Sequence, residues 1–259
     1  MAILTLISDY NSDDLYTGII KGKLTESCPG TTLVDLKHTI TPFSYIQAAI
    51  SLKIAYKHFP KGTIHLIMVN TIATETEPWV AVEAEGHYFI GVANGIFQLL
   101  FEEVNFRIFK IDLQGVAFPP SFPELVVFPK IAAFLLAGGK VEDLGPPLYN
   151  LKKIPNFLAS YDSHQIEGHV IHIDTYSNAI TNINQTKFEE YRKGRNFKII
   201  VRSNHNLIEQ IDETYSPRKA GNLMALFNAA GLLEIAMYQG RLCEMLDIDA
   251  KTNIKILFL

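Results

Sequence analysis

Cysteine is scarce in this chain, and Cys28 and Cys243 are the only two among its 259 residues. Two cysteines so far apart in sequence have no metal-ligand spacing, and they are too few for a disulfide framework. We therefore expect two buried free thiols and a reducing, cytoplasmic compartment.

Long apolar runs and clusters of basic residues are also missing. No uncharged apolar run approaches the roughly 20 residues that a bilayer span needs, and no basic stretch precedes the first apolar segment as in a signal peptide. The net charge is −4 and the isoelectric point is near 6.1, so the chain has no global attraction to nucleic acid or anionic lipid. We expect neither a membrane nor a nucleic acid among its partners.

The dinucleotide fingerprint G-x-G-x-x-G and the phosphate-binding motif G-x-x-x-x-G-K-[ST] are absent from the sequence as well. The histidines are scattered, and His169 and His172 differ by three, which places them on opposite faces of a strand. The sequence therefore indicates neither nucleotide-dependent hydride or phosphoryl transfer nor a metal or other cofactor.

Apolar residues are abundant and regularly patterned. Hydrophobic residues make up 48% of the chain and charged residues 19%, which is enough to bury a core. Short apolar runs alternate with helical segments in the first part, which predicts a mostly parallel, Rossmann-like α/β sandwich over residues 1–155. The expected strands cover residues 3–8, 32–36, 63–69, 79–82 and 87–92, and the expected helices cover residues 15–27, 44–59, 97–103 and 129–137.

The last part of the chain lacks this alternation. Its short apolar runs are interrupted by only two brief helices, at 187–193 and 242–246. This pattern predicts a small β-barrel domain over residues 165–259, with a boundary near 150–165 where the periodicity is lost. The expected strands cover residues 168–174, 197–201, 232–237 and 254–258.

Carboxylates gather in the first loop. Asp9 follows the first strand, and ligands of open α/β sheets bind beyond the carboxyl ends of the strands. Asp9 is therefore a candidate acceptor for the hydroxyls of a ribose, and a helix N-cap is an equally good interpretation. Asp14 is either an acid of the first helical turn or a partner for a ligand ammonium group.

Several ordered motifs resemble those of the S-adenosylmethionine (SAM) hydroxide adenosyltransferases, a family that includes SAM-dependent fluorinases and chlorinases. The opening S-D-Y with Asp14, Tyr16 and Lys21-Gly22 is similar to the family's T-D-F-G-x-x-D-x-Y-x-G-x-x-K-G. The resemblance continues in order along nearly the whole chain, through V-D-L-K-H at 34–38, F-P-K-G-T at 59–63, A-N-G at 93–95, I-D-T-Y-S-N at 173–178, T-N-I at 181–183 and G-L-L-E-I-A at 231–236.

This resemblance implies a fold, a ligand and an assembly. The family combines an N-terminal α/β domain with a C-terminal β-barrel, uses SAM as substrate and requires no cofactor. Its members are typically homotrimers, in which the ligand lies between the N-terminal domain of one subunit and the C-terminal domain of its neighbour. The resemblance therefore implies a small-molecule partner, SAM or adenosine, held by residues from both domains.

The resemblance also assigns roles to residues of the N-terminal part. Asp9 would hold the ribose hydroxyls, and Phe43 would pack near the sugar, with plain core burial as its alternative. Asp14 would meet the methionine amino group, and Tyr16 would lie next to the methionine carboxylate. Asn94 stands in A-N-G where the family usually has D-N-G, and it is included in the expected ligand site.

Residues of the C-terminal part would hold the rest of the ligand. Asp174 would meet the methionine amino group through charge-assisted hydrogen bonds. Asn178 would bond the adenine edge, and Tyr215 would stack on the ring. The backbone around Met237 and Gln239 would complete this site. The alternatives are a turn residue for Asn178 and a partly buried surface aromatic for Tyr215.

The reacting part of the family's site is altered here. In the hydrolase branch an Asp, an Arg and a His handle the attacking water, and the matching positions are Asn70, Glu77 and Pro123. The halide-contacting Ser and Thr of the halogenase branch match Glu124 and Ala73, and a carboxylate repels a halide. Glu77 or Glu124 would orient or deprotonate water if its carboxylate faced the ligand. The alternative is that both are exposed loop acids.

The catalytic candidates are therefore Asn70, Glu77 and Glu124. Three functions stay open on these residues. The first is hydrolysis of SAM to adenosine and methionine with altered catalytic groups. The second is binding of SAM or adenosine without efficient turnover, and the third is a reaction on another adenosyl substrate.

Overall fold

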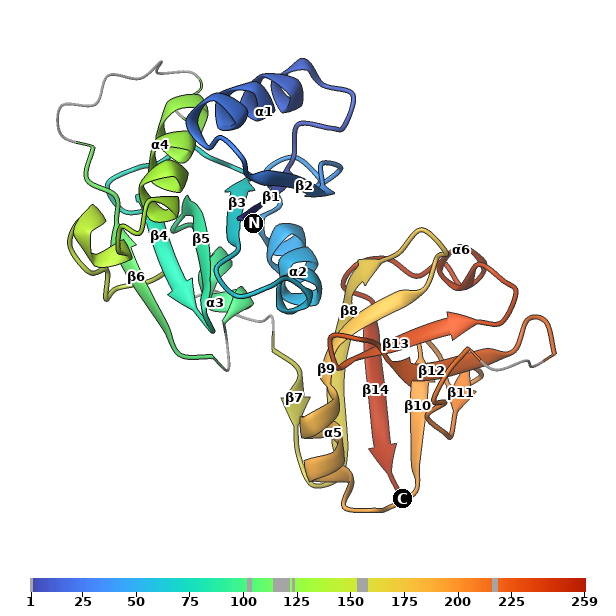
Figure 1. The fold of residues 1–259 in the computed structure, drawn as a ribbon. Helices are drawn as coiled ribbons and strands as arrows, with labels where there is room; N and C mark the ends of the chain where they lie inside the picture. The colour runs from blue at the N-terminus through green and yellow to red at the C-terminus, as the bar shows by residue number, and fades with distance from the viewer. Residues whose placement is uncertain (1, 102–103, 114–121, 123, 153–157, 216–218) are drawn as a thin grey trace. The chain divides into compact units, whose positions relative to one another are not determined.

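The computed structural model describes residues 2–101, 104–113, 122, 124–152, 158–215 and 219–259. The chain divides into two compact units, Met1–Ile154 and Pro155–Leu259 (Figure 1). Within the described residues, no helix is both long and apolar enough to cross a membrane.

The first unit is built on a six-stranded sheet with the order β2-β1-β3-β5-β4-β6. The strands are β1 (Ile3–Ser8), β2 (Thr32–Lys37), β3 (Ile64–Met68), β4 (Trp79–Ala84), β5 (His87–Val92) and β6 (Phe106–Lys110). The pairs β1–β2, β1–β3 and β3–β5 are parallel, whereas β4 runs antiparallel to both β5 and β6. The predicted parallel pairing holds for the first four strands in this order, and the sheet as a whole is mixed.

Strand β4 is joined to its antiparallel neighbour β5 by the predicted hairpin. Glu85 and Gly86 both have positive φ angles, 50° and 84°. Two successive residues of this kind match the twist of a tight two-residue hairpin.

Helices cover both faces of this sheet (Figure 1). They are α1 (Leu15–Ser27), α2 (Tyr45–Ala55), α3 (Ile96–Leu100) and α4 (Glu124–Leu136), with short 3₁₀ helices η1 (Tyr56–His58) and η2 (Val141–Leu144). Leu4 and Leu6 of β1 pack with α1 and α4, and Ile7 packs with α2 and α3. Alternate residues of a strand point to opposite faces, so the nearly continuous apolar run of β1 is explained by cover on both sides.

Helix α4 begins five residues before the predicted start at Pro129. The prediction was wrong because proline is favoured in the first turn of a helix, whereas Pro129 lies inside α4. The missing hydrogen bond of Pro129 is offset by burial, since Val127, Phe128 and Ile131 all lie in the core. The helix expected at 97–103 is α3, and residues 102–103 lie outside the described part.

The second unit is an antiparallel sheet with the order β11-β10-β14-β8-β9-β13-β12, to which β7 adds beside β8. The strands are β7 (Ser160–Tyr161), β8 (Gln165–Ile173), β9 (Ala179–Asn184), β10 (Phe197–Val201), β11 (Leu207–Ile208), β12 (Leu223–Phe227), β13 (Leu232–Met237) and β14 (Asn253–Phe258), and the helices are α5 (Gln185–Arg192) and α6 (Leu242–Met245). The two end strands, β11 and β12, lie in contact, so the sheet is nearly closed and barrel-like, as predicted for this part.

Candidate functional site

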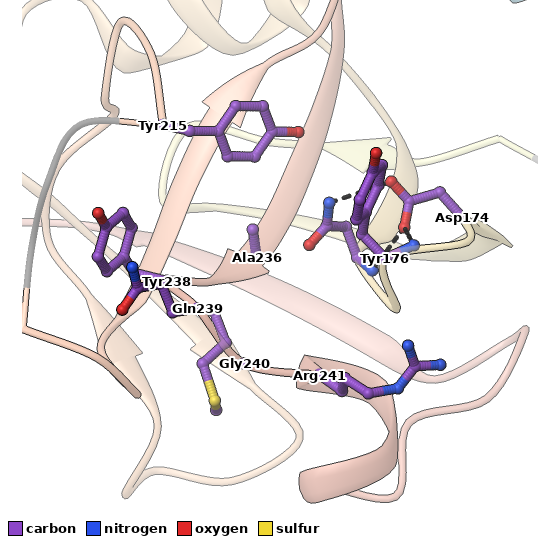
Figure 2. Close-up of a pocket in the computed structure, with 10 residues that line it drawn as sticks. Asp174, Tyr176, Tyr215, Ala236, Tyr238, Gln239, Gly240 and Arg241 are labelled. Carbon is purple, nitrogen blue, oxygen red and sulfur yellow. Dashed lines mark hydrogen bonds between the residues drawn. The ribbon is translucent and has the colours of Figure 1, made fainter.

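A pocket of about 570 Å³ lies in the second unit, at the end of β13 and the turn between β8 and β9. This volume is typical of small-molecule sites, which span roughly 300–1,000 Å³. Figure 2 shows its side chains around Ala236, with Tyr215 and Tyr238 on one side and Asp174 and Tyr176 on the other. The lining residues are Asp174, Tyr176, Asn178, Tyr215, Ala236, Met237, Tyr238, Gln239, Gly240 and Arg241. All the ligand residues expected in the C-terminal part are among them.

The turn between β8 and β9 is organised by Asp174. Its Oδ1 accepts from the backbone N–H groups of Tyr176 and Asn178, at 2.9 and 2.8 Å. Its Oδ2 accepts from Asn178 Nδ2 at 3.0 Å. Because a carboxylate only accepts, this contact fixes which end of the Asn178 amide is the nitrogen. Asn178 is therefore a turn residue, with its amide oxygen and second Nδ2 hydrogen directed away from Asp174.

Tyr215 presents an aromatic ring to the pocket. The side chain is 53% exposed, yet its hydroxyl donates to Oε1 of the buried Glu234 on β13. Asn228 Nδ2 donates to the other oxygen of Glu234 at 3.3 Å. Burial, followed by the hydrogen bond to Glu234, raises the pKa of Tyr215. The phenol therefore stays protonated and anchored at one end while the ring remains available for stacking.

In the first unit, the N-cap role considered for Asp9 belongs to Asp14. Asp14 is the N-cap of α1, and its Oδ1 accepts from Tyr16 N at 2.9 Å. Asp9 is not a helix cap; its Oδ2 accepts from Phe43 N at 2.8 Å. The capping interpretation of Asp9 was therefore wrong.

The loop that carries Asp9 is supported by a chain of hydrogen bonds that runs from the buried Ser8 and His38 to the exposed Asp35. Ser8 Oγ lies 2.7 Å from His38 Nδ1, and His38 Nε2 lies 3.0 Å from Asp35 Oδ1. Since the carboxylate only accepts, His38 Nε2 donates to it and Nδ1 of a neutral ring accepts from Ser8. Lys21 Nζ binds the other Asp35 oxygen at 2.6 Å. Asn11 N donates to His38 O at 2.7 Å, so His38 holds the loop at two points.

The other expected ligand residues of the first unit are two aromatics and one amide, Tyr16, Phe43 and Asn94. Tyr16 stacks on Phe122, with ring centroids 4.1 Å apart and an interplanar angle of 20°. Phe43 has a positive φ of 65° and is 67% exposed, so core burial was wrong for it. Asn94 is buried, and its Oδ1 accepts from Ile96 N at 3.3 Å at the start of α3.

The three catalytic candidates have different environments. Asn70 lies just after β3 with a φ of 50°. Glu77 forms an ion pair with Lys152, with Oε1 and Nζ 2.7 Å apart. Glu124 opens α4, is 2% exposed, and accepts the Tyr10 hydroxyl through Oε1. The alternative of an exposed loop acid was therefore wrong for Glu124, and Pro123 lies outside the described residues.

Sequence reasoning missed several pocket and site residues. Tyr10 lies inside the first motif, which was the available signal, and Glu234 lies inside the last. Tyr176 lies inside the motif at 173–178, whereas Tyr238 and Arg241 follow β13 directly and belong to none of the motifs. Where the chain is described, no group of three or more His, Cys, Asp or Glu side chains could hold a metal ion.

A mixed α/β unit with carboxylates at its strand ends, followed by a barrel-like unit with an aromatic pocket, defines a small-molecule-binding protein of two parts. Residues 4–145 match the SAM hydroxide adenosyltransferase N-terminal domain, and residues 168–255 match the C-terminal domain of that family. The chain belongs to the SAM hydroxide adenosyltransferase family.

Individual relatives match over almost the full length. The chain is 27% identical to an (R)-S-adenosyl-L-methionine hydrolase of Methanocaldococcus jannaschii, covering 99% of this chain and 96% of the relative. It is 29% identical to a protein of the same name from Thermus thermophilus, covering 97% and 98%. An uncharacterized conserved protein from Thermotoga maritima has a similar fold, with a TM-score of 0.86 at 22% identity over 99% and 100% of the two chains.

Proposed function

We propose that this protein binds SAM and hydrolyses it to adenosine and methionine. The observation that carries the proposal is the pocket of about 570 Å³ that combines the Tyr215 ring with the oriented Asn178 amide. Family membership supports it, as do the two relatives named (R)-S-adenosyl-L-methionine hydrolase, which match nearly the whole chain.

The adenine would occupy the pocket of the second unit. Tyr215 offers a ring face for stacking, a contact worth about 1–3 kcal/mol per base. The Asn178 amide has one acceptor and one donor hydrogen free, which is the pair that reads the amino group and adjacent ring nitrogen of adenine. The backbone of Met237 and Gln239 would close the base edge.

The ribose and the methionine part would be held by polar groups. Asp9 would accept hydrogen bonds from the ribose hydroxyls beside the exposed Phe43 ring. Asp14, Tyr16 and Asp174 would meet the amino and carboxylate groups of methionine. We further propose a homotrimer in which residues of both units serve one ligand, testable by light scattering on the purified protein.

Turnover is tested directly by incubating the protein with SAM and following adenosine and methionine by chromatography, with and without a chelator. We expect equimolar adenosine and methionine, at a rate unchanged by the chelator. Calorimetric titration with SAM is run in parallel. Binding without product would favour the alternative of a protein that binds SAM without efficient turnover. The absence of both binding and product would contradict the proposal.

A mild substitution tests the adenine pocket. Tyr215→Phe keeps the ring and removes the hydroxyl that Glu234 anchors, so we expect adenosine to bind about 5-fold more weakly, in line with one hydrogen bond worth about 1 kcal/mol. The affinity is measured by calorimetry. Tyr149→Phe, on a tyrosine that is 85% exposed, is the matched control and should leave the affinity unchanged. An unaltered affinity for Tyr215→Phe would contradict the anchoring role.

A further inference from the structure

We propose that Glu124 accepts the proton of the attacking water and that Tyr10 positions its carboxylate. The inference rests on the proposed hydrolysis of SAM and names the group that activates the nucleophile. Its starting point is a buried oxygen: Glu124 is 2% exposed, and its Oε2 has no hydrogen-bond partner. Leaving a buried polar atom without a hydrogen-bond partner costs free energy, and the cost is larger when the atom is charged. A water molecule at Oε2 would remove this cost.

The other oxygen of Glu124 is already fixed in direction. Oε1 accepts the Tyr10 hydroxyl, and a hydrogen bond to the Thr71 side chain also acts on the same phenol. Burial, followed by the hydrogen bond to Glu124, raises the pKa of Tyr10. Tyr10 therefore remains a donor over the physiological pH range and holds the carboxylate in one orientation, with Oε2 as its remaining acceptor.

Tyr10 also places Glu124 beside the substrate-binding loops. It follows Asp9, the proposed ribose ligand, while Thr71 follows Asn70 in the loop after β3. Both loops leave the carboxyl ends of parallel neighbours, β1 and β3, where ligands of α/β sheets bind. The carboxylate that is missing at Asn70 is thus supplied by Glu124. The Tyr10 hydroxyl connects the two positions, since it contacts Glu124 and also Thr71, the residue after Asn70.

Glu77 is less suited to this role. Its Oε1 is paired with the ammonium group of Lys152 at 2.7 Å, and its side chain is 26% exposed. The ammonium group of Lys152 thus occupies one of the two carboxylate oxygens that would otherwise be available to a water molecule. Among the described residues Glu124 forms no ion pair, and it stands at the first position of α4.

The proposed step balances without any further reactant. The water oxygen attacks the ribose carbon that bears the sulfonium, so a C–O bond forms as the C–S bond breaks. The bonding electron pair goes to sulfur, which becomes the neutral thioether of methionine. One water proton passes to Glu124 Oε2 and is later released to solvent, leaving adenosine. A positioned base contributes typically about 10²–10⁴-fold to such a step.

The test is a set of variants assayed with SAM. Glu124→Gln should lower kcat about 100-fold while the dissociation constant for SAM changes less than about 3-fold. Tyr10→Phe should lower kcat about 10-fold while KM stays nearly unchanged, because the carboxylate loses the hydrogen bond that fixes its orientation. A general disturbance of the binding loop would raise KM as well. Glu26→Gln, on the exposed side of α1, is the control.

The outcomes separate the two proposals. Full activity of Glu124→Gln, or a loss confined to Glu77→Gln, would overturn the role of Glu124 and leave hydrolysis intact. An inactive parent would overturn both. Thermal melting checks that the variants fold, and added formate should partly restore Glu124→Ala, since it returns a carboxylate to the site. Failure of formate to restore a folded Glu124→Ala, together with an unchanged kcat for Tyr10→Phe, would also contradict the inference.

Discussion

Replacing Asp9 with alanine should weaken adenosine binding about 100-fold. The carboxylate of Asp9 is half-buried and carries one internal contact, from Phe43 N at 2.8 Å, so it has acceptor capacity for two ribose hydroxyls. Hydrogen bonds to a charged group are worth about 1.5–3 kcal/mol each, and the lower figure for two of them corresponds to about 100-fold. Calorimetric titration with adenosine measures the effect, and Asp13→Ala, on an exposed aspartate of the same loop, is the control.

A ligand lacking the hydroxyls separates this contact from a general disturbance of the loop. The parent protein should bind 2′,3′-dideoxyadenosine about 100-fold more weakly than adenosine, because both hydrogen bonds to Asp9 are lost. With this ligand, the Asp9→Ala substitution should weaken binding little further. An equal penalty of the substitution for both nucleosides would show that Asp9 acts on the loop and not on the ribose.

Acid should destabilise the first unit by up to about 5 kcal/mol between pH 6.5 and pH 3. His65 is fully buried, with Nδ1 2.7 Å from Thr5 Oγ1 and Nε2 3.3 Å from His87 Nδ1. Burial, and then the charge of His87, lower the pKa of His65 to about 3. Below pH 6.5 the unfolded chain binds a proton that the folded chain excludes, so stability falls with pH until the folded pKa is reached, at about 1.4 kcal/mol per pH unit.

The measurement is urea unfolding followed by the fluorescence of Trp79, the single tryptophan of the chain, which lies in β4 of this unit. His65→Gln should flatten the dependence of the free energy of unfolding on pH between 6.5 and 4, because glutamine does not titrate. His58→Gln, on an exposed histidine, should keep the parent slope. The same slope in all three proteins would assign the acid sensitivity to other groups.

Local patterns predicted many elements closely. The bounds of β1, α1, β5, β10 and β13 agree with those expected from the sequence, because each is a continuous apolar run or a helix bounded by capping and breaking residues. Strands β6, β7, β9, β11 and β12 were missed. In β9, Thr181 and Asn182 interrupt the apolar pattern; Thr181 is nevertheless buried, with its hydroxyl bonded to Leu233 O at 2.9 Å. Such polar residues enter a core only where a distant strand supplies the partner.

Some features of the candidate site could likewise be predicted from the sequence, and others could not. The sequence by itself determined the order of the motifs, the two-part fold class and the position of Asp9 at a strand end, since these depend on neighbours along the chain. Only the tertiary structure decided that Asp9 binds Phe43 N, that Glu234 anchors Tyr215, and that Glu124 is buried against Tyr10.

The Tyr10–Glu124 contact joins residues 114 positions apart, and local periodicity carries no information on contacts of that range. From the sequence, a glutamate at the start of a helix is expected to be a solvated acid. The burial of Glu124 follows only from the packing of α4 against the first loop. Burial and the lack of a partner for Oε2 arise from that packing, and they turn an ordinary glutamate into a candidate base.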